Sequence, residues 1–118
     1  MKESILKNKS YDFAIKIVQT YKLICANKKE FSLSKQLLRS GTSIGANIRE
    51  AEFAQSNKDF IHKMSIALKE SNETEYWLSI LNDTDFIETK TYTELNSANE
   101  ELLKMLISTI KTMKAKKS

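Results

Sequence analysis

The acidic, histidine and cysteine residues of this sequence are the ones whose spacing could support metal binding or catalysis. Helical bundles that hold metal ions usually carry a Glu-x-x-His pair on each of two helices together with two further glutamates. Here the only histidine, His62, stands three residues after Asp59, so the sequence has one pair of this kind where two are needed. Cys25 is the only cysteine. Glu70 and Glu73 stand three residues apart, a spacing that could raise the pKa of one carboxyl. The pattern predicts no metal, no cofactor and no catalytic residue, with His62 at the surface and Cys25 as a buried, inert thiol.

The lysine residues are a second group with chemical potential, because they can neutralise phosphate groups. The 118-residue chain has a formal net charge of +4. Residues 1–35 hold eight lysines against three acids, and residues 111–118 add four lysines and no acid. Such segments attract nucleic acid, acidic proteins or anionic surfaces, or serve only as solubilising tails. The candidate contacts for nucleic acid are Lys16, Lys22, Lys28, Lys29, Lys111, Lys114, Lys116 and Lys117.

Amphipathic helices are the elements that must position these side chains. Apolar residues recur at helical spacing, no strand-like alternation competes with them, and the links between them are short. Ser10 is a candidate N-cap, and Ser56–Asp59 and Thr91–Glu94 both resemble capping boxes. We therefore expect one domain, residues 1–118, with an all-α fold, an up-down-up-down antiparallel four-helix bundle. The predicted helices span residues 11–27, 33–54, 57–82 and 92–115.

Hydropathy adds two expectations. The sequence has no run of 18 apolar residues, and its N-terminus is charged where a signal peptide would be apolar, so we expect a cytoplasmic protein without a membrane role. In the first helix, apolar residues at i, i+3, i+4 and i+7 form a single stripe that should face the core. This stripe consists of Ala14, Ile17, Val18, Tyr21, Ile24 and Cys25.

Both glycines of the chain, Gly41 and Gly45, lie four residues apart inside the second predicted helix. A glycine in a helix interior costs about 1 kcal/mol relative to alanine, so two of them need a compensating gain. Close packing of a neighbouring helix against the backbone is that gain. A phosphate-binding loop does not fit, because Ala46 follows Gly45 where a P-loop requires lysine.

The second and third helices each carry a further face beside the one that points to the core. Large apolar residues on two faces of one helix suggest an additional surface to bury, and another copy of the chain is one candidate. The alternative is that the third helix is central and contacts two neighbours within one bundle. The accompanying acids, with Arg39 opposite, favour an interface between copies. The interface candidates are Arg39, Ser43, Asn47, Glu50, Ile66, Glu70, Glu73, Trp77 and Ile80.

Two stretches, RSGTSIGANIREA at residues 39–51 and SNKDFIHKMSIALKESNETEYWL at residues 56–78, resemble a known family. It is the four-helix-bundle family named for proteins encoded in intervening sequences of bacterial 23S ribosomal RNA genes, also labelled S23 ribosomal protein. Many members have proline where Gly45 stands. The resemblance implies a homopentamer with no known catalytic activity. It also implies a relation to accessory subunits of diversity-generating retroelements, which work with a reverse transcriptase and nucleic acid.

Two functional hypotheses remain open from the sequence. The first is a non-enzymatic oligomeric bundle whose lysines contact the phosphates of RNA or DNA without sequence-specific readout, since the sequence reveals no aromatic stacking platform and no recognised nucleic-acid-binding motif. The second is an oligomeric scaffold or adaptor that binds a protein partner and has no direct role with nucleic acid.

Overall fold

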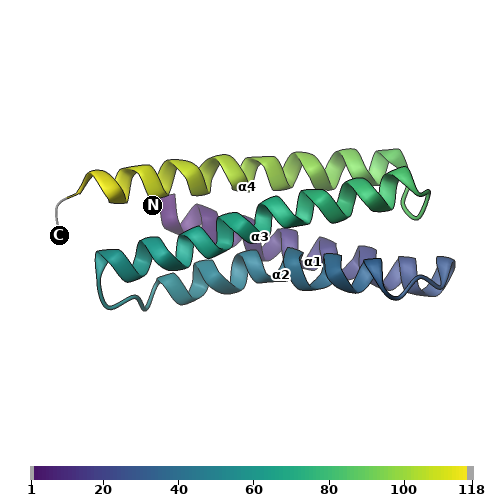
Figure 1. Cartoon of the computed structure of the whole chain (residues 1–118), viewed down its shortest axis with the longest axis horizontal. Coiled ribbons are helices and arrows are strands. Elements are labelled where there is room, and N and C mark those ends of the chain that lie inside the picture. The colour runs from purple at the N-terminus through teal and green to yellow at the C-terminus, as the bar shows by residue number, and fades with distance from the viewer. Residues whose placement is uncertain (1, 117–118) are drawn as a thin grey trace.

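The chain forms four long helices that run alternately up and down a rod (Figure 1). The structure, a computed structural model, describes residues 2–116. Its extents are 50 × 20 × 20 Å, and α1 and α3 each pack against both α2 and α4. The predicted all-α, antiparallel four-helix bundle is therefore confirmed. The helices are α1 (Lys2–Lys28), α2 (Leu33–Ala51), α3 (Asn57–Asp83) and α4 (Thr89–Ala115).

The start of α1 differs from the predicted one. Ser10 was expected to cap a helix that begins at Tyr11, but α1 already begins at Lys2. Ser10 lies inside the helix, where its hydroxyl donates to the carbonyl oxygen of Lys7 at 3.0 Å and is buried against α2. A serine hydroxyl can bond to its own helix as readily as it can cap one, which is why the cap prediction was wrong.

The core is a single apolar cluster to which all four helices contribute. On α1 the buried line includes Leu6 and Phe13, which the predicted stripe omitted, together with Ile17 and Ile24. The other four residues of the predicted stripe are half-buried at its edge. They are Ala14, Val18, Tyr21 and Cys25.

Polar side chains cross this core in pairs. Ser71 donates its hydroxyl to Asn99 at 2.8 Å, and the Asn99 amide donates to the Ser71 carbonyl oxygen at 2.9 Å. Thr74 donates to Ser40 at 3.0 Å and links α3 to α2. Since buried polar groups are costly when unpaired, these bonds favour one register of α3 against its neighbours.

The two glycines lie where α1 crosses α2. A Cβ atom added to Gly41 would come within 2.8 Å of the Ile17 side chain, closer than real Cβ contacts allow. At Gly45 the added atom would lie 3.3 Å from the carbonyl oxygen of Ser10. The missing side chains therefore let α1 pack directly on the backbone of α2, as expected from their spacing.

The remaining helix ends test the capping predictions. The hydroxyl of Ser56 accepts from the backbone N–H of Asp59 at 3.0 Å, so the predicted cap of α3 is present. The α4 prediction was wrong, because the helix begins at Thr89 after Glu88 and already contains Thr91 and Glu94. These two residues lie within the first turns of α4 and do not mark its start. The second helix ends at residue 51, before the predicted 54.

Candidate nucleic-acid and interaction surfaces

One end of the rod joins three chain segments that are distant in sequence. The turn between α2 and α3 lies there, together with the start of α1 and the last turns of α4 (Figure 1). The amide of Asn57, in the first turn of α3, donates to the carbonyl oxygen of Met113 in α4 at 3.0 Å. Residues 49–63 and 111–116, which we call the basic end, therefore form one continuous surface.

The basic end has an excess of positive charge. It holds six Lys or Arg residues and three Asp or Glu residues. Two of the three acids are paired with lysines: Glu50 binds Lys63 at 3.0 Å and Glu52 binds Lys7 at 2.8 Å. The hydrogen bond that Lys63 donates to Glu50 raises the pKa of Lys63, so that lysine stays charged. Within the basic end, five cations form no ion pair with the described residues: Arg49, Lys58, Lys111, Lys114 and Lys116.

The other end of the rod is balanced in charge. Residues 28–35 and 82–90, which we call the opposite end, hold four Lys or Arg residues and four Asp or Glu residues. Lys28 and Lys29 lie here, at the far end of the 50 Å axis from Lys111 and Lys114. The structure therefore does not gather the predicted lysine contacts into one patch. Lys16 and Lys22 are exposed along α1 between the ends, and Lys117 lies outside the described residues.

The carboxylate of Glu30 holds the turn between α1 and α2 through hydrogen bonds to the backbone instead of pairing with a lysine. Lys29 has a φ of 54°, and the carboxylate of Glu30 then accepts backbone N–H bonds from Ser32, Leu33 and Ser34 at 2.7–2.9 Å. Burial pushes the pKa of Glu30 upward, but these bonds outweigh it and hold the pKa below the ordinary value of 4.5. Glu30 therefore caps the N-terminus of α2, a role that Ser32 does not take.

The single cysteine lies beside this turn. Cys25 is half-buried, and its sulfur lies 3.7 Å from the carbonyl oxygen of Glu30 and 3.8 Å from the hydroxyl oxygen of Ser34. A hydrogen bond with Cys25 raises the pKa of Tyr21. The thiol is thus tied to the turn, and it is less buried than the sequence led us to expect.

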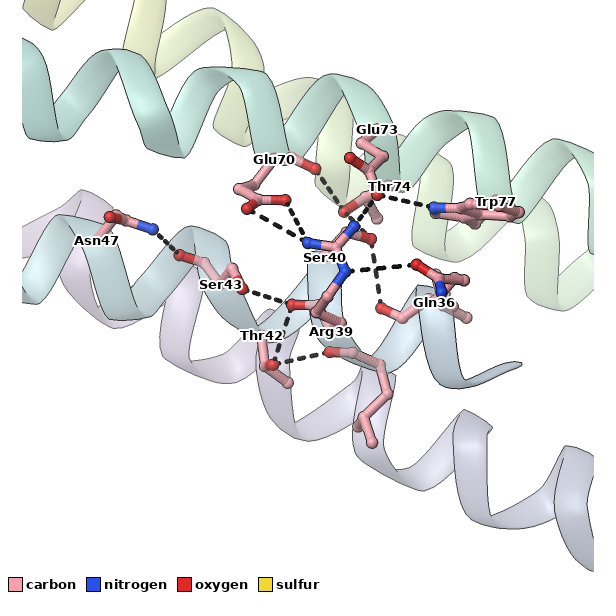
Figure 2. Close-up of polar contacts among 12 residues, drawn as sticks. Gln36, Arg39, Ser40, Thr42, Ser43, Asn47, Glu70, Glu73, Thr74 and Trp77 are labelled. Atoms are coloured by element: carbon pink, nitrogen blue, oxygen red, sulfur yellow. Dashed lines mark hydrogen bonds and ion pairs between the residues drawn. The ribbon is translucent and has the colours of Figure 1, made fainter. Parts of the chain in front are cut away.

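Figure 2 shows Arg39 of α2 facing Glu70 and Glu73 of α3 within one chain. The guanidinium of Arg39 reaches across to Glu70, at 3.2 Å, and to Glu73. Glu73 also accepts from the indole nitrogen of Trp77 at 3.0 Å. Glu70 and Glu73, the acids that favoured an interface between copies, therefore find their partners inside the protomer. This is what the alternative expects, in which α3 contacts two neighbours within one bundle.

The other members of this set make local contacts. Ser43 donates to the Arg39 carbonyl oxygen at 2.6 Å, and Asn47 donates to the Ser43 carbonyl oxygen at 2.9 Å. Beside the two carboxylates that bind Arg39, α3 bears a hollow of about 570 Å³. Trp77, Ile66 and Ile80 are only half-buried, so this face still has apolar surface to cover. The hollow is lined by Ile66, Lys69, Glu70, Asn72, Glu73 and Tyr76.

Sequence reasoning missed most of the exposed apolar side chains, because it assigned the surplus apolar surface to α2 and α3. Four of them lie on α1 instead, at Ile5, Tyr11, Ile15 and Leu23. Two phenylalanines project from turns, Phe31 at the opposite end and Phe53 at the basic end. The only available signal was their position in short polar links between helices.

The described residues contain neither a cluster of metal ligands nor a membrane-spanning helix. Among residues 2–116, no three His, Cys, Asp or Glu side chains come together in a way that could hold a metal ion. His62 is exposed, as predicted. Over the same residues, no helix is long and apolar enough to cross a membrane.

Comparison with known proteins adds a family and a close structure. The family described as 23S rRNA-intervening sequence protein matches residues 2–108. A crystal structure of a protein with unknown function from the S23 ribosomal protein family of Bacteroides thetaiotaomicron VPI-5482 is 57% identical to this chain. The match covers 94% of this chain and 99% of that one, with a TM-score of 0.93. No curated protein matches the chain.

Proposed function

Because the chain belongs to the 23S rRNA-intervening sequence protein family, we propose that it is a non-enzymatic, oligomeric helical bundle in the cytoplasm that binds nucleic acid through its basic end. The observation that carries this proposal is the uneven distribution of charge along the rod. At the basic end six cations, five of them without an ion-pair partner, stand beside three acids, whereas four cations and four acids balance at the opposite end. Unpaired lysine and arginine side chains neutralise phosphates at little desolvation cost, since both partners stay largely hydrated.

The binding is expected to be independent of base sequence in a duplex. No helix of the basic end is isolated in a way that would let it enter a major groove, since each packs along its length against two neighbours. Contacts to phosphates carry no sequence information of their own. The proposed ligand is therefore RNA or DNA recognised through its backbone.

A salt titration tests this proposal. If the five cations each contact one phosphate, log affinity for duplex DNA should fall with log salt concentration with a slope of about −4.5 per protomer. A slope near zero, or no binding at low salt, would contradict the proposal. The second outcome would also favour the protein-scaffold alternative.

Self-association would increase the affinity for nucleic acid, because one basic end alone offers few phosphate contacts. Several copies around an axis present several basic ends, so that one nucleic-acid chain engages them with increased effective concentration. The family resemblance supports a homopentamer, and the half-buried apolar residues beside the α3 hollow support a contact between copies there. A scaffold of this form needs no catalytic group.

Light scattering distinguishes the oligomer from a single protomer. Tyr76, exposed at the α3 hollow, is the best residue to change, because Arg39 and Trp77 also hold the protomer together. Tyr76→Glu should lower the measured mass to that of one chain. The matched control Ile107→Glu, on the outer side of α4, should keep the mass of the assembly. A wild-type protein with the mass of one chain would overturn this part of the proposal.

A protein-binding scaffold is the second candidate, and the exposed apolar side chains of α1 favour it. Ile5, Tyr11, Ile15 and Leu23 are large apolar residues on one helix, and such clusters commonly mark contact surfaces. This role requires no nucleic acid. It predicts that reversing charge at the basic end leaves the protein's interactions unchanged.

A further inference from the structure

We propose that the basic end selects single-stranded over duplex nucleic acid, with the ring of Phe53 serving as a platform on which an unpaired base stacks. The inference rests on the proposed function, because it needs the basic end to bind nucleic acid. It adds the class of ligand and the residue that distinguishes it.

Phe53 is presented to solvent by a hydrogen-bonded turn. This residue is 79% exposed, more than any other large apolar residue among the described ones. The backbone beneath it is held by bonds from Phe53 N–H to Glu50 O at 3.0 Å and from Ala54 N–H to Ala51 O at 3.1 Å. The Ser56 cap of α3 follows directly. A ring held outward on fixed backbone loses little conformational freedom when a base stacks on it.

Cations flank this ring on both sides of the turn. Arg49 precedes it by one helical turn, and Lys58 stands in the first turn of α3. The bond between Asn57 and Met113 brings the last turn of α4, with Lys114, to the same end. An aromatic ring among cations that track a backbone is the usual arrangement of single-strand binding surfaces.

A second aromatic ring continues the surface along the groove between α1 and α2. The guanidinium carbon of Arg49 lies 5.8 Å from the centre of the Tyr11 ring, and the Tyr11 side chain is 56% exposed. Both residues line a groove of about 270 Å³ over Gly45. A single strand that stacks on Phe53 can therefore follow Arg49 toward a second exposed ring.

The proposed selectivity has a simple physical origin. In a duplex the bases are already stacked and paired, so an exposed phenylalanine on a turn reaches only phosphate and sugar. In a single strand every base has a free face, and an aromatic side chain can stack on any of them without reading sequence. Phe53 should therefore contribute to single-strand binding and contribute almost nothing to duplex binding.

The chain contains a matched control for this residue. Phe31 is also an exposed phenylalanine in a turn between two helices, with 58% of its side chain exposed. It lies at the opposite end, where Lys28 and Lys29 are balanced by the acids of the α3–α4 turn. The two phenylalanines share residue type, exposure and position in a turn, but differ in the charge around them.

The test measures affinities of the full chain for an oligothymidylate of about 20 nucleotides and for the same length of duplex DNA, at low salt. Phe53→Ala should weaken single-strand binding by about fivefold or more, and should change duplex binding by less than about twofold. Phe31→Ala should change neither. Phe53→Tyr should restore single-strand affinity, whereas Phe53→Leu, which is apolar but has no ring, should not.

The outcomes separate this inference from the proposed function. If Phe53→Ala leaves single-strand affinity unchanged, or lowers single-strand and duplex affinity equally, the stacking platform is wrong while binding by the basic end stands. If the wild-type protein binds neither nucleic acid at low salt, the proposed function falls and the inference falls with it. Thermal unfolding of each variant, followed by circular dichroism, shows whether a loss of affinity reflects a loss of fold.

Discussion

The two ends of the bundle are built from the same parts but use their charges differently. At the opposite end, the carboxylate of Glu30 is consumed by three backbone donors at the start of α2. At the basic end, the hydroxyl of Ser56 caps α3, and the nearby acids Glu50 and Glu52 pair with lysines. Both turns project a phenylalanine, yet only Phe53 stands at an end where cations outnumber acids, six to three, whereas four of each lie at the end of Phe31. The proposed function rests on this difference in charge between two ends of otherwise similar construction.

The largest expected effect comes from reversing charge at one end and then at the other. Changing Lys111, Lys114 and Lys116 to glutamate should lower affinity for nucleic acid by about 100-fold or more at low salt, and should reduce the salt slope on duplex DNA by about 2.7. The matched variant changes Lys28, Lys29 and Lys35 to glutamate and alters the net charge equally. It should lose much less affinity. Equal losses in fluorescence anisotropy titrations would mean that overall charge, not the basic end, governs binding.

Removing the cap at the opposite end should destabilise the fold without affecting binding. Glu30→Ala leaves three backbone N–H groups at the start of α2 without their acceptor, which should lower the free energy of unfolding by about 1–2 kcal/mol. Urea unfolding followed by circular dichroism measures this loss. Unchanged stability would show that water replaces the carboxylate at no cost.

The pH dependence of stability should follow the same carboxylate. The folded-state pKa of Glu30 lies below the ordinary value of 4.5, so the unfolded chain binds the proton first as the pH falls. The stabilisation is therefore complete above the ordinary pKa and is lost as the pH drops from there through the folded-state pKa. Glu30→Gln should remove this part of the acid sensitivity. Parallel curves for wild type and variant would contradict the assignment.

The smallest effects are expected on the free energy of unfolding, from two residues of the turn between α2 and α3. Ser56→Ala should cost about 1 kcal/mol through loss of the α3 cap. Glu52→Gln, which breaks an exposed ion pair with Lys7, should cost about 0.5 kcal/mol or less. Urea unfolding checks both values. If Glu52→Gln proves the more costly, this turn depends on its charges more than on its cap.

How far the sequence predicted this molecule depends on whether a feature is local. Helical period, the Ser56 cap and the small residues at Gly41 and Gly45 report on neighbouring residues, and the structure agrees with each of them. The start of α1 was missed because Ser10 satisfies both a cap pattern and a buried position against Gly45.

The surfaces were harder to predict because they depend on which helices become neighbours. A helical wheel gives the direction of Arg39 and Glu70 on their own helices, but not that α2 and α3 turn these side chains toward each other. The lysines of α1 and of the tail look like one basic set in the sequence, and the fold separates Lys28 from Lys114 along a 50 Å axis. The exposure of Phe53 depends on the path of one turn, which no periodicity encodes.

The most direct test of the account is lysine footprinting by mass spectrometry, with and without a saturating single-stranded oligonucleotide. If the basic end is the binding surface, Lys58, Lys111 and Lys114 become protected from chemical modification. Lys28 and Lys29, at the other end of the same rod, should react as they do in the free protein. Protection of Lys28 and Lys29 alone, or equal protection at both ends, would contradict the account.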